Sequence, residues 1–335
     1  MTEPLVSIKM VTYNHAPFIA QAIEGVLQQK TNFPFELIIG EDCSTDGTRE
    51  IVFEYQKKYP EIIRVVTSEK NIGAKRNGLR TLKACHGKYI AYCEGDDYWH
   101  DPGKLQKQVD YLENHPECGM VYSSFDVYHV KTKERIRDFI NYRKWKMPEN
   151  PNITDILESK GGRSRGITTC TVMLRRIICE EIMDADPYLH QSTDFLMGDT
   201  QLWAEMAAKS RLHYIPESMA THIITEESAT RSKDVKKELL FGISGAKLQL
   251  YLCDKYNLPS HIRFKYQEYL HTCLLGLAFH TRNREMADEI RNKKKTFRIK
   301  ERLQYYGAKN MVVYEIYRLS SLLLNLFKKK HNQWM

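Results

Sequence analysis

The sequence lacks the features of a membrane-spanning or exported protein. A helix that crosses a bilayer takes about 20 consecutive apolar residues, and no stretch among the 335 residues approaches that length. Residues 1–5 do not have the basic segment followed by an apolar segment that is typical of a secretory signal. We therefore expect a cytoplasmic protein, with contact at the inner face of the cell membrane as an alternative.

Closely spaced cysteine pairs are also missing. Zinc sites and disulfide frameworks typically contain pairs such as CxxC. Neither kind of site is indicated here, and we expect buried thiols. The eight cysteines are scattered along the chain, at positions 43, 85, 93, 118, 170, 179, 253 and 273.

The composition is that of an ordinary globular protein. Hydrophobic residues make up 42% and aromatic residues 11% of the chain, so most of it should be ordered. The net charge of +8 is compatible with nucleic acid, anionic lipid or a phosphorylated ligand, and by itself it does not choose among them. No nucleic-acid partner is predicted.

Short apolar runs alternate with helical patterns in the first third of the chain. This alternation predicts an α/β fold with a largely parallel central sheet, in which ligands bind beyond the carboxyl ends of the strands. The predicted strands are 6–13, 35–40, 62–67 and 89–93, and the helices between them are 16–29, 45–59 and 74–85.

Three carboxylates follow the fourth predicted strand within four positions. Glu94, Asp96 and Asp97 come directly after the apolar run 89–93. An unpaired acidic cluster at this place would be costly to fold around, and Mg²⁺ or Mn²⁺ prefers such oxygen ligands. The motif therefore indicates a bound divalent cation, with a solvated acidic turn as the alternative.

Polar residues also follow the first two predicted strands. They are 12–14 after the first strand and 41–42 after the second, so three segments should converge on one crevice. Ser44 and Asp101 precede helical patterns and are expected to cap them.

Missing residues disfavour a dinucleotide-binding fold and exclude a phosphate loop at residues 73–78. Residues 11–17 contain none of the glycines that a dinucleotide-binding fold places after its first strand. Residues 73–78 have the outer glycine spacing of a phosphate loop, but Leu79 and Arg80 follow where Lys and Ser or Thr are required.

Taken together, the motifs resemble the family 2 glycosyltransferases over about residues 4–225. They are Val-Thr-Tyr-Asn at 11–14, Glu-Asp-Cys-Ser-Thr-Asp-Gly-Thr at 41–48, Asn-Ile-Gly at 71–73 and Glu-Gly-Asp-Asp-Tyr-Trp at 94–99. The resemblance implies a GT-A (nucleotide-diphospho-sugar transferase) fold, a nucleotide-activated sugar donor and inversion at the anomeric carbon. It also implies a catalytic domain at 1–228, with a nucleotide-sugar half at 1–115 and an acceptor-side half at 116–228, followed by a helical region at 229–335.

The resemblance also assigns the donor site. It places Val11, Tyr13 and Asn14 beside the base and Asp42 within reach of a uracil N–H, with Asn77 and its neighbour Arg76 supporting the nucleotide. A carboxylate accepts a hydrogen bond from uracil but offers nothing equivalent to the ring nitrogen of cytosine, so a UDP-sugar is favoured. A helix cap is the alternative for Asp42, and a solvated helix face is the alternative for Arg76.

In the acidic motif, Asp96 matches the position near the ribose and Asp97 the position that holds Mn²⁺ or Mg²⁺. The metal would offset the charge that develops on the leaving nucleotide. Glu94 stands where many relatives carry Asp, and its role is left open.

An inverting transfer needs a general base, which takes the proton of the acceptor hydroxyl. By resemblance this base is Asp199, which opens an apolar-periodic segment. A plain helix N-cap is the alternative for Asp199, and Asp194 is the rival base. His222 matches a diphosphate position only loosely, so a surface or core histidine stays open.

Two further segments have alternative interpretations. The polar, basic segment 131–166 is either a mobile acceptor-side loop or a linker, and the residues that follow it, 167–174, are predicted to form a strand. In the helical C-terminal region, 266–279 and 311–327 are strongly apolar, and Lys328 to Lys330 follow the second of them. That second helix either lies on an anionic membrane or packs on the core.

The expected function is that of a metal-dependent inverting glycosyltransferase of the hexosyltransferase type. It would transfer sugar from a UDP-sugar to a saccharide or lipid-linked saccharide in surface polysaccharide biosynthesis. A sugar-phosphate nucleotidyltransferase is the first alternative, but residues 12–14 do not supply its glycine-rich loop. A non-catalytic sugar-nucleotide or glycan-binding module is the second, and the joint presence of Asp42, Asp96, Asp97 and Asp199 argues against it.

Overall fold

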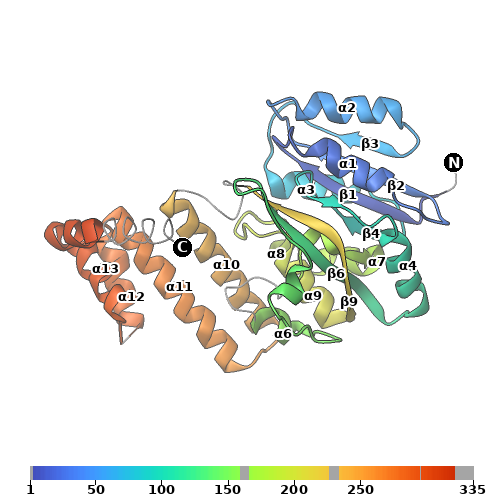
Figure 1. Cartoon of the computed structure of the whole chain (residues 1–335). Helices are drawn as coiled ribbons and strands as arrows, with labels where there is room; N and C mark the ends of the chain where they lie inside the picture. Colours follow the sequence, from blue (N-terminus) through green and yellow to red (C-terminus); the bar gives the residue numbers. More distant parts are fainter. Residues whose placement is uncertain (1–2, 159–165, 226–233, 295, 321–335) are drawn as a thin grey trace. The chain divides into compact units, whose positions relative to one another are not determined.

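The computed structural model describes residues 3–158, 166–225, 234–294 and 296–320. The chain divides into two compact units, Met1–Glu226 and Glu227–Met335, which are taken one at a time below (Figure 1).

The first unit begins with the alternation expected from the sequence. Strands β1 to β4 are mutually parallel and lie in the order β3-β2-β1-β4. This confirms the α/β prediction for this part of the chain, and each helix starts within three residues of its predicted position. The elements are β1 (Val6–Thr12), α1 (Ile19–Leu27), β2 (Phe35–Glu41), α2 (Thr48–Lys58), β3 (Ile63–Val66), α3 (Ala74–Lys83) and β4 (Tyr89–Tyr92).

Beyond β4 the sheet becomes mixed. Strand β8 pairs antiparallel with β4 and β6, whereas β6 and the long strand β9 run parallel. The described residues thus form one sheet in the order β3-β2-β1-β4-β8-β6-β9-β5, with β7 paired to β6. The strands are β5 (Tyr98–Trp99), β6 (Cys118–His129), β7 (Glu134–Ile136), β8 (Met173–Arg175) and β9 (Arg211–Ile224).

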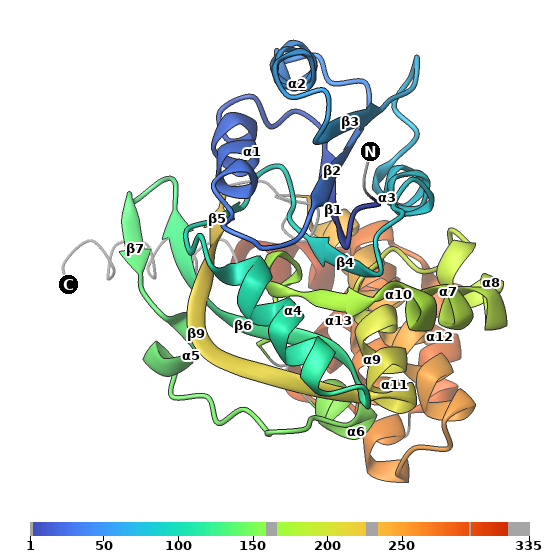
Figure 2. The same cartoon turned by 90° about the vertical axis from the view of Figure 1, so that its right-hand side faces the viewer.

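Helices cover both faces of this sheet. Figure 2 shows α1 and α4 (Lys104–Asn114) on one side and α3 and α7 (Arg176–Ala185) on the other. Because side chains alternate along a strand, Ile8 and Met10 of β1 join the core with α1 and α4. The remaining helices of this unit are α5 (Phe139–Tyr142), α6 (Ile153–Glu158), α8 (Pro187–Gln191) and α9 (Thr200–Lys209).

The segment expected to be a strand over 167–174 is mostly not one. Only β8 is extended, and the residues before it form a short 3₁₀ helix, η1 (Thr169–Thr171). The segment expected to be a loop at 131–166 contains β7, α5 and α6, whereas its residues 159–165 lie outside the described part.

Lys104 is a charged residue in the core of the first unit. It is 0% exposed, and its Nζ lies 2.7 Å from Gln108 Oε1 and 4.2 Å from the centroid of the Trp99 ring. Burial lowers the pKa of this ammonium to about 7 from its usual 10.5. The lysine therefore holds its proton less tightly in the folded protein than in the unfolded chain.

This shift predicts a pH dependence of stability. Between pH 7 and 10.5 the unfolded chain keeps a proton that folded Lys104 has released, so raising the pH stabilises the fold. We expect the free energy of unfolding of the wild type, relative to Lys104→Met, to rise by about 3–5 kcal/mol at most across this window. Urea denaturation of both proteins at several pH values measures it, and a constant difference would contradict the assignment.

The second unit is helical in its described part. Its helices are α10 (Val235–Lys255), α11 (Ser260–Thr281), α12 (Arg284–Lys293) and α13 (Ile299–Lys309), and residues 311–320 are also helical. Leu275 and Ala278 of α11 pack with Ile290 of α12 and Ala308 of α13 in a small core. In the described residues, no helix has the length and apolar character needed to cross a membrane. The membrane role predicted for 311–327 stays a prediction, because residues 321–335 lie outside the described part.

Candidate active site

The ends of β1, β2 and β4 are joined by backbone hydrogen bonds. Asp42 N donates to Thr12 O at 3.1 Å, and Gly95 N donates to Val11 O at 3.0 Å. Gly95 is required here, because a Cβ at this position would come within 2.7 Å of the Thr12 side chain. The three loops predicted to converge therefore meet at one edge of the sheet.

Asn14 links the first two of these loops. Its backbone N–H donates to Ser44 Oγ at 3.0 Å, and its Oδ1 accepts from Thr45 N at 2.9 Å. Asn14 adopts φ 54°, a left-handed conformation that Asn tolerates better than most residues. Neighbouring Tyr13 is 43% exposed and offers its ring to solvent. The exposed ring of Tyr13 thus lies beside a loop that the hydrogen bonds of Asn14 hold in place.

The predicted cap at Ser44 is wrong. The Ser44 hydroxyl is engaged by Asn14, and α2 begins later, after Gly47 in a left-handed conformation of φ 98°. Asp46 accepts from Thr48 N at 3.0 Å instead. Asp101 was also predicted to cap a helix, but the N-cap residue of α4 is Gly103. The Asp101 side chain accepts from Gly103 N at 2.8 Å, in the turn before α4.

Asp42 lies at the end of β2 and is only 2% exposed. Its two carboxylate oxygens accept from Ile72 N and Gly73 N, each at 2.9 Å. Asp42 is therefore not a cap of α2 but holds the loop that leads into α3. Each oxygen has a further lone pair, and the contact with a uracil N–H stays a prediction.

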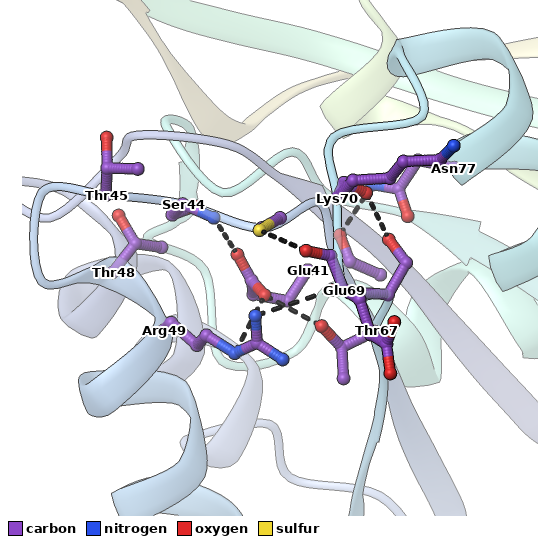
Figure 3. Close-up of polar contacts among 12 residues, drawn as sticks. Glu41, Ser44, Thr45, Thr48, Arg49, Thr67, Glu69, Lys70 and Asn77 are labelled. Carbon is purple, nitrogen blue, oxygen red and sulfur yellow. Dashed lines mark hydrogen bonds and ion pairs between the residues drawn. The ribbon is translucent and has the colours of Figure 1, made fainter.

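Glu41, which the sequence analysis did not select, forms a polar cluster behind this loop (Figure 3). The side chain is 0% exposed, and it accepts from Ser44 N at 2.6 Å and from Thr67 Oγ1 at 2.9 Å. Arg49 Nε lies 3.6 Å from its Oε2. These contacts fasten the loop after β2 to α2 and to Thr67, which follows β3. The contact with Thr67 spans 26 residues, too far for local patterns to predict.

Asn77 is a buried packing residue at the start of α3. Its Nδ2 donates to Gly40 O at 2.7 Å, and its Oδ1 accepts from Arg80 at 2.6 Å. Gly40 allows α3 to approach the sheet, since a Cβ there would lie 1.9 Å from Thr81 Oγ1. The predicted role of Asn77 toward a nucleotide stays a prediction.

Asp97 lies at the centre of the acidic motif and is 4% exposed. Its Oδ1 accepts from Ile223 N at 2.8 Å, and His222 Nδ1 lies 3.1 Å from both of its oxygens. Partial burial of the ring opposes protonation of His222, but the carboxylates of Asp97 and Asp96 outweigh it and raise the pKa of His222 to about 9. The structure therefore places His222, which the sequence left open, on the acidic motif.

The other two acids of the motif are crowded by like charge. Burial and the charges of Asp97 and Asp96 raise the pKa of Glu94 to about 8. Burial and the charge of Asp97 likewise raise the pKa of Asp96, whose Oδ1 lies 3.9 Å from His15 Nδ1. Glu94 Oε2 is buried and accepts no hydrogen bond from the described residues. A divalent cation would relieve this crowding of negative charge and give the Glu94 oxygen a partner.

Asp199 lies at the start of α9, where its Oδ1 accepts from Thr200 N at 2.6 Å. Its Oδ2 lies 3.3 Å from the Thr169 hydroxyl of η1. The carbonyl oxygen of the next residue of η1, Cys170, accepts from Trp99 Nε1 at 2.7 Å, and burial and the charge of Asp97 raise the pKa of the Cys170 thiol. One turn of chain thus contacts both Asp199 and Trp99, the last residue of the acidic motif, and this bridge was not predicted. The capping alternative for Asp199 is also realised in the structure.

Asp194, the rival base, is exposed and accepts from Tyr188 Oη at 2.9 Å. Among the described residues, no three His, Cys, Asp or Glu side chains form a ready-made metal site. Mg²⁺ commonly takes only one or two protein carboxylates and completes its shell with substrate phosphates and water. The acidic motif fits that arrangement.

Relatives in sequence match part of the chain. An uncharacterized protein of Mycobacterium tuberculosis is 47% identical over 116 residues, which cover 35% of this chain and 34% of that protein. The chain thus spans about a third of the length of such relatives. The Escherichia coli UDP-Glc:alpha-D-GlcNAc-diphosphoundecaprenol beta-1,3-glucosyltransferase WfgD is 27% identical over 196 residues, 58% of this chain and 69% of that one.

Two solved structures share the fold. TarS 1-349 of S. aureus, in complex with UDP-GlcNAc, superposes with a TM-score of 0.54 at 15% identity and covers 94% of this chain and 92% of its own. The mannosyltransferase PcManGT of Pyrobaculum calidifontis, in complex with GDP-Man and Mn²⁺, gives 0.51 at 16% identity, with coverages of 95% and 88%. These likenesses confirm the predicted GT-A fold.

The sequence profile described as "Glycosyl transferase family 2" matches residues 7–182. This range includes β1 to β4, the acidic motif and η1, and it is more than half of the chain. The chain therefore belongs to glycosyl transferase family 2.

Proposed function

We propose that this protein is an inverting, metal-dependent hexosyltransferase that uses a UDP-sugar. The observation that carries the proposal is η1, which contacts the Asp199 carboxylate through Thr169 and Trp99, the last residue of the acidic motif, through the carbonyl oxygen of Cys170. A metal ligand for the leaving diphosphate and a base for the incoming hydroxyl belong on opposite sides of the same sugar. Because η1 contacts both Asp199 and the acidic motif that carries Asp97, it can hold the base and the metal ligand at a fixed separation.

The donor base would lie on the loops after β1 and β2. We assign Val11, Tyr13 and Asn14 to its surroundings and Asp42 to the uracil N–H. The exposed ring of Tyr13 can stack on a base. Asp96 would contact the ribose, and Asn77 would support the nucleotide through the loop that it fixes to β2.

Mn²⁺ or Mg²⁺ would be held by Asp97, with its remaining ligands from the diphosphate. The bound cation would neutralise charge on the departing nucleotide. His222 lies on the same carboxylate, so its cationic ring would reach the same phosphates. Asp199 would take the acceptor proton, because Thr200 N and Thr169 Oγ1 keep its carboxylate in position.

The acceptor is proposed to be a saccharide or lipid-linked saccharide of surface polysaccharide biosynthesis. The E. coli relative WfgD is named for a diphosphoundecaprenol-linked acceptor, which supports this class. Residues 1–228 would form the catalytic domain, with the donor half at 1–115 and the acceptor side at 116–228, and 229–335 a helical region. A lipid-linked acceptor would bring the protein to the inner face of the cell membrane.

A thermal-shift experiment tests the donor and the metal together. A ligand that binds only the native state raises its apparent stability. We expect UDP with Mn²⁺ to raise the melting temperature more than UDP alone, and more than GDP with Mn²⁺. Asp42→Asn should reduce the preference for UDP, because an amide presents a donor as well as an acceptor to the base. Equal shifts with UDP and GDP would contradict the uridine assignment.

A further inference from the structure

Helix α13 presents its apolar side to solvent. Ile299 is 80%, Leu303 40% and Tyr306 57% exposed, and their i, i+4, i+7 spacing puts them on one face. The opposite face carries Glu301 and Gln304, which are only 3% and 7% exposed, together with Ala308, which joins the small core of this unit. An ordinary surface helix turns its large apolar side chains toward the core, whereas α13 exposes Ile299, Leu303 and Tyr306.

Contacts of Glu301 explain why the polar face points inward. Glu301 Oε1 lies 2.8 Å from both Lys294 Nζ and Thr272 Oγ1, and Oε2 accepts from Arg298 N at 2.8 Å. Lys294 is itself 7% exposed and also pairs with Glu268 at 2.8 Å. The buried acid is thus satisfied, and the fold of this unit does not use the apolar stripe of α13.

The helix over 311–320 also exposes apolar side chains. Tyr314 and Tyr317 pack against the Phe279 ring, with ring centroids 4.7 and 5.1 Å away. Away from this contact, Val312, Ile316 and Leu319 are 66%, 63% and 51% exposed, with the same i, i+4, i+7 spacing. We call Ile299, Leu303, Tyr306, Val312, Ile316 and Leu319 the C-terminal apolar surface.

Positive charge accompanies this surface. The acids of residues 296–320 are Glu301, which is buried with Lys294, and Glu315, which pairs with Arg318 at 2.8 Å. Lys300 and Arg302 are exposed beside the stripe of α13. The same range also contains Arg298, Lys309, which pairs with Asp288 at 2.6 Å, and Arg318. Exposed apolar side chains flanked by cations are complementary to an anionic lipid surface. The apolar side chains would insert at the boundary of the acyl chains, and the cations would contact the anionic headgroups.

We propose that the C-terminal apolar surface docks on an anionic lipid bilayer, with α13 lying in the plane of the interface. A second copy of the chain would suit the surface less well, because two copies face to face would bring the flanking cations of both together. The proposed function enters this inference only as the reason for membrane contact, which is a lipid-linked acceptor. Binding to the bilayer itself requires neither the sugar donor nor the metal.

Vesicle flotation of the full chain tests the proposal. We expect binding to phosphatidylcholine vesicles that contain phosphatidylglycerol and little binding to phosphatidylcholine alone. Ile299→Asp combined with Leu303→Asp should lower the bound fraction at least about tenfold, because it removes apolar area and adds negative charge. Lys300→Glu with Arg302→Glu should lower it as well. Ile177→Asp is the matched control, since Ile177 on α7 is 60% exposed and lies outside the surface.

Several results would overturn the proposal. The proposal is wrong if the wild-type protein floats with neither kind of vesicle, or if it binds both kinds equally. It is also wrong if the double aspartate variant binds as well as the wild type. Light scattering that shows a dimer lost in this variant, without vesicle binding, would reassign the surface to a second copy. Melting temperatures check that the variants are folded, and UDP-dependent thermal shifts in all of them keep this failure distinct from a failure of the proposed function.

Discussion

Replacement of Asp199 by Asn is expected to slow sugar transfer by about 10²- to 10⁴-fold, the range that a general base contributes. Asn cannot take the acceptor proton, but its side-chain oxygen can still accept from Thr200 N, as Asp199 does at 2.6 Å. Asn is as good an N-cap as Asp, so α9 should keep its start. Donor binding should therefore be unchanged while turnover falls.

Two measurements separate these effects. Release of UDP in the presence of acceptor reports transfer, and the UDP-dependent thermal shift reports binding. Asp194→Asn is the matched control, since Asp194 is a nearby exposed carboxylate that contacts Tyr188. Full activity of Asp199→Asn would remove the base from our mechanism, and loss of activity in Asp194→Asn alone would move the role to Asp194.

Replacement of Asp97 by Asn should abolish the additional thermal shift that Mn²⁺ gives to UDP. The amide offers the cation one neutral oxygen in place of a carboxylate, which divalent hard cations bind much less well. Asn keeps an acceptor for Ile223 N, now 2.8 Å from Asp97 Oδ1. Ala would leave that buried N–H without a partner, at a cost of about 1–3 kcal/mol that would obscure the result.

The control for Asp97→Asn is a buried carboxylate that is not one of the three acids of the motif. Asp126 on β6 is 6% exposed and accepts from Ser218 Oγ at 2.6 Å and from Asp138 N at 3.0 Å. Asp126→Asn should alter stability without altering the Mn²⁺-dependent shift. If Asp97→Asn retains the full Mn²⁺ effect, another group holds the metal.

Local patterns were sufficient for the first four strands and their helices. Each strand is a short, nearly continuous apolar run, as burial on both faces requires, and polar residues mark its end. Cap positions were less predictable. Ser44 is a good N-cap type, yet Asn14 takes up its hydroxyl, and the start of α2 moves to Thr48. A contact across 30 residues decided this boundary.

In the candidate site, too, some features follow from local sequence and others depend on distant contacts. Glu94, Asp96 and Asp97 are adjacent in the chain, so their crowding follows from the sequence alone. Their partners do not: His222 and Ile223 are more than 120 residues away, and η1 lies in a segment that had been expected to be a strand. No local signal connects Thr169 with Asp199 either.

For this protein, the order of the residues determined which segments form helices and strands and where acidic side chains gather, because both depend on neighbours within a few positions. Tertiary packing alone decided which side of α13 faces the interior. The periodicity of α13 defines an apolar and a polar face, but the buried ion pair of Glu301 and Lys294 turns the polar one inward. Such a choice depends on partners from other helices, whose positions a local pattern does not contain.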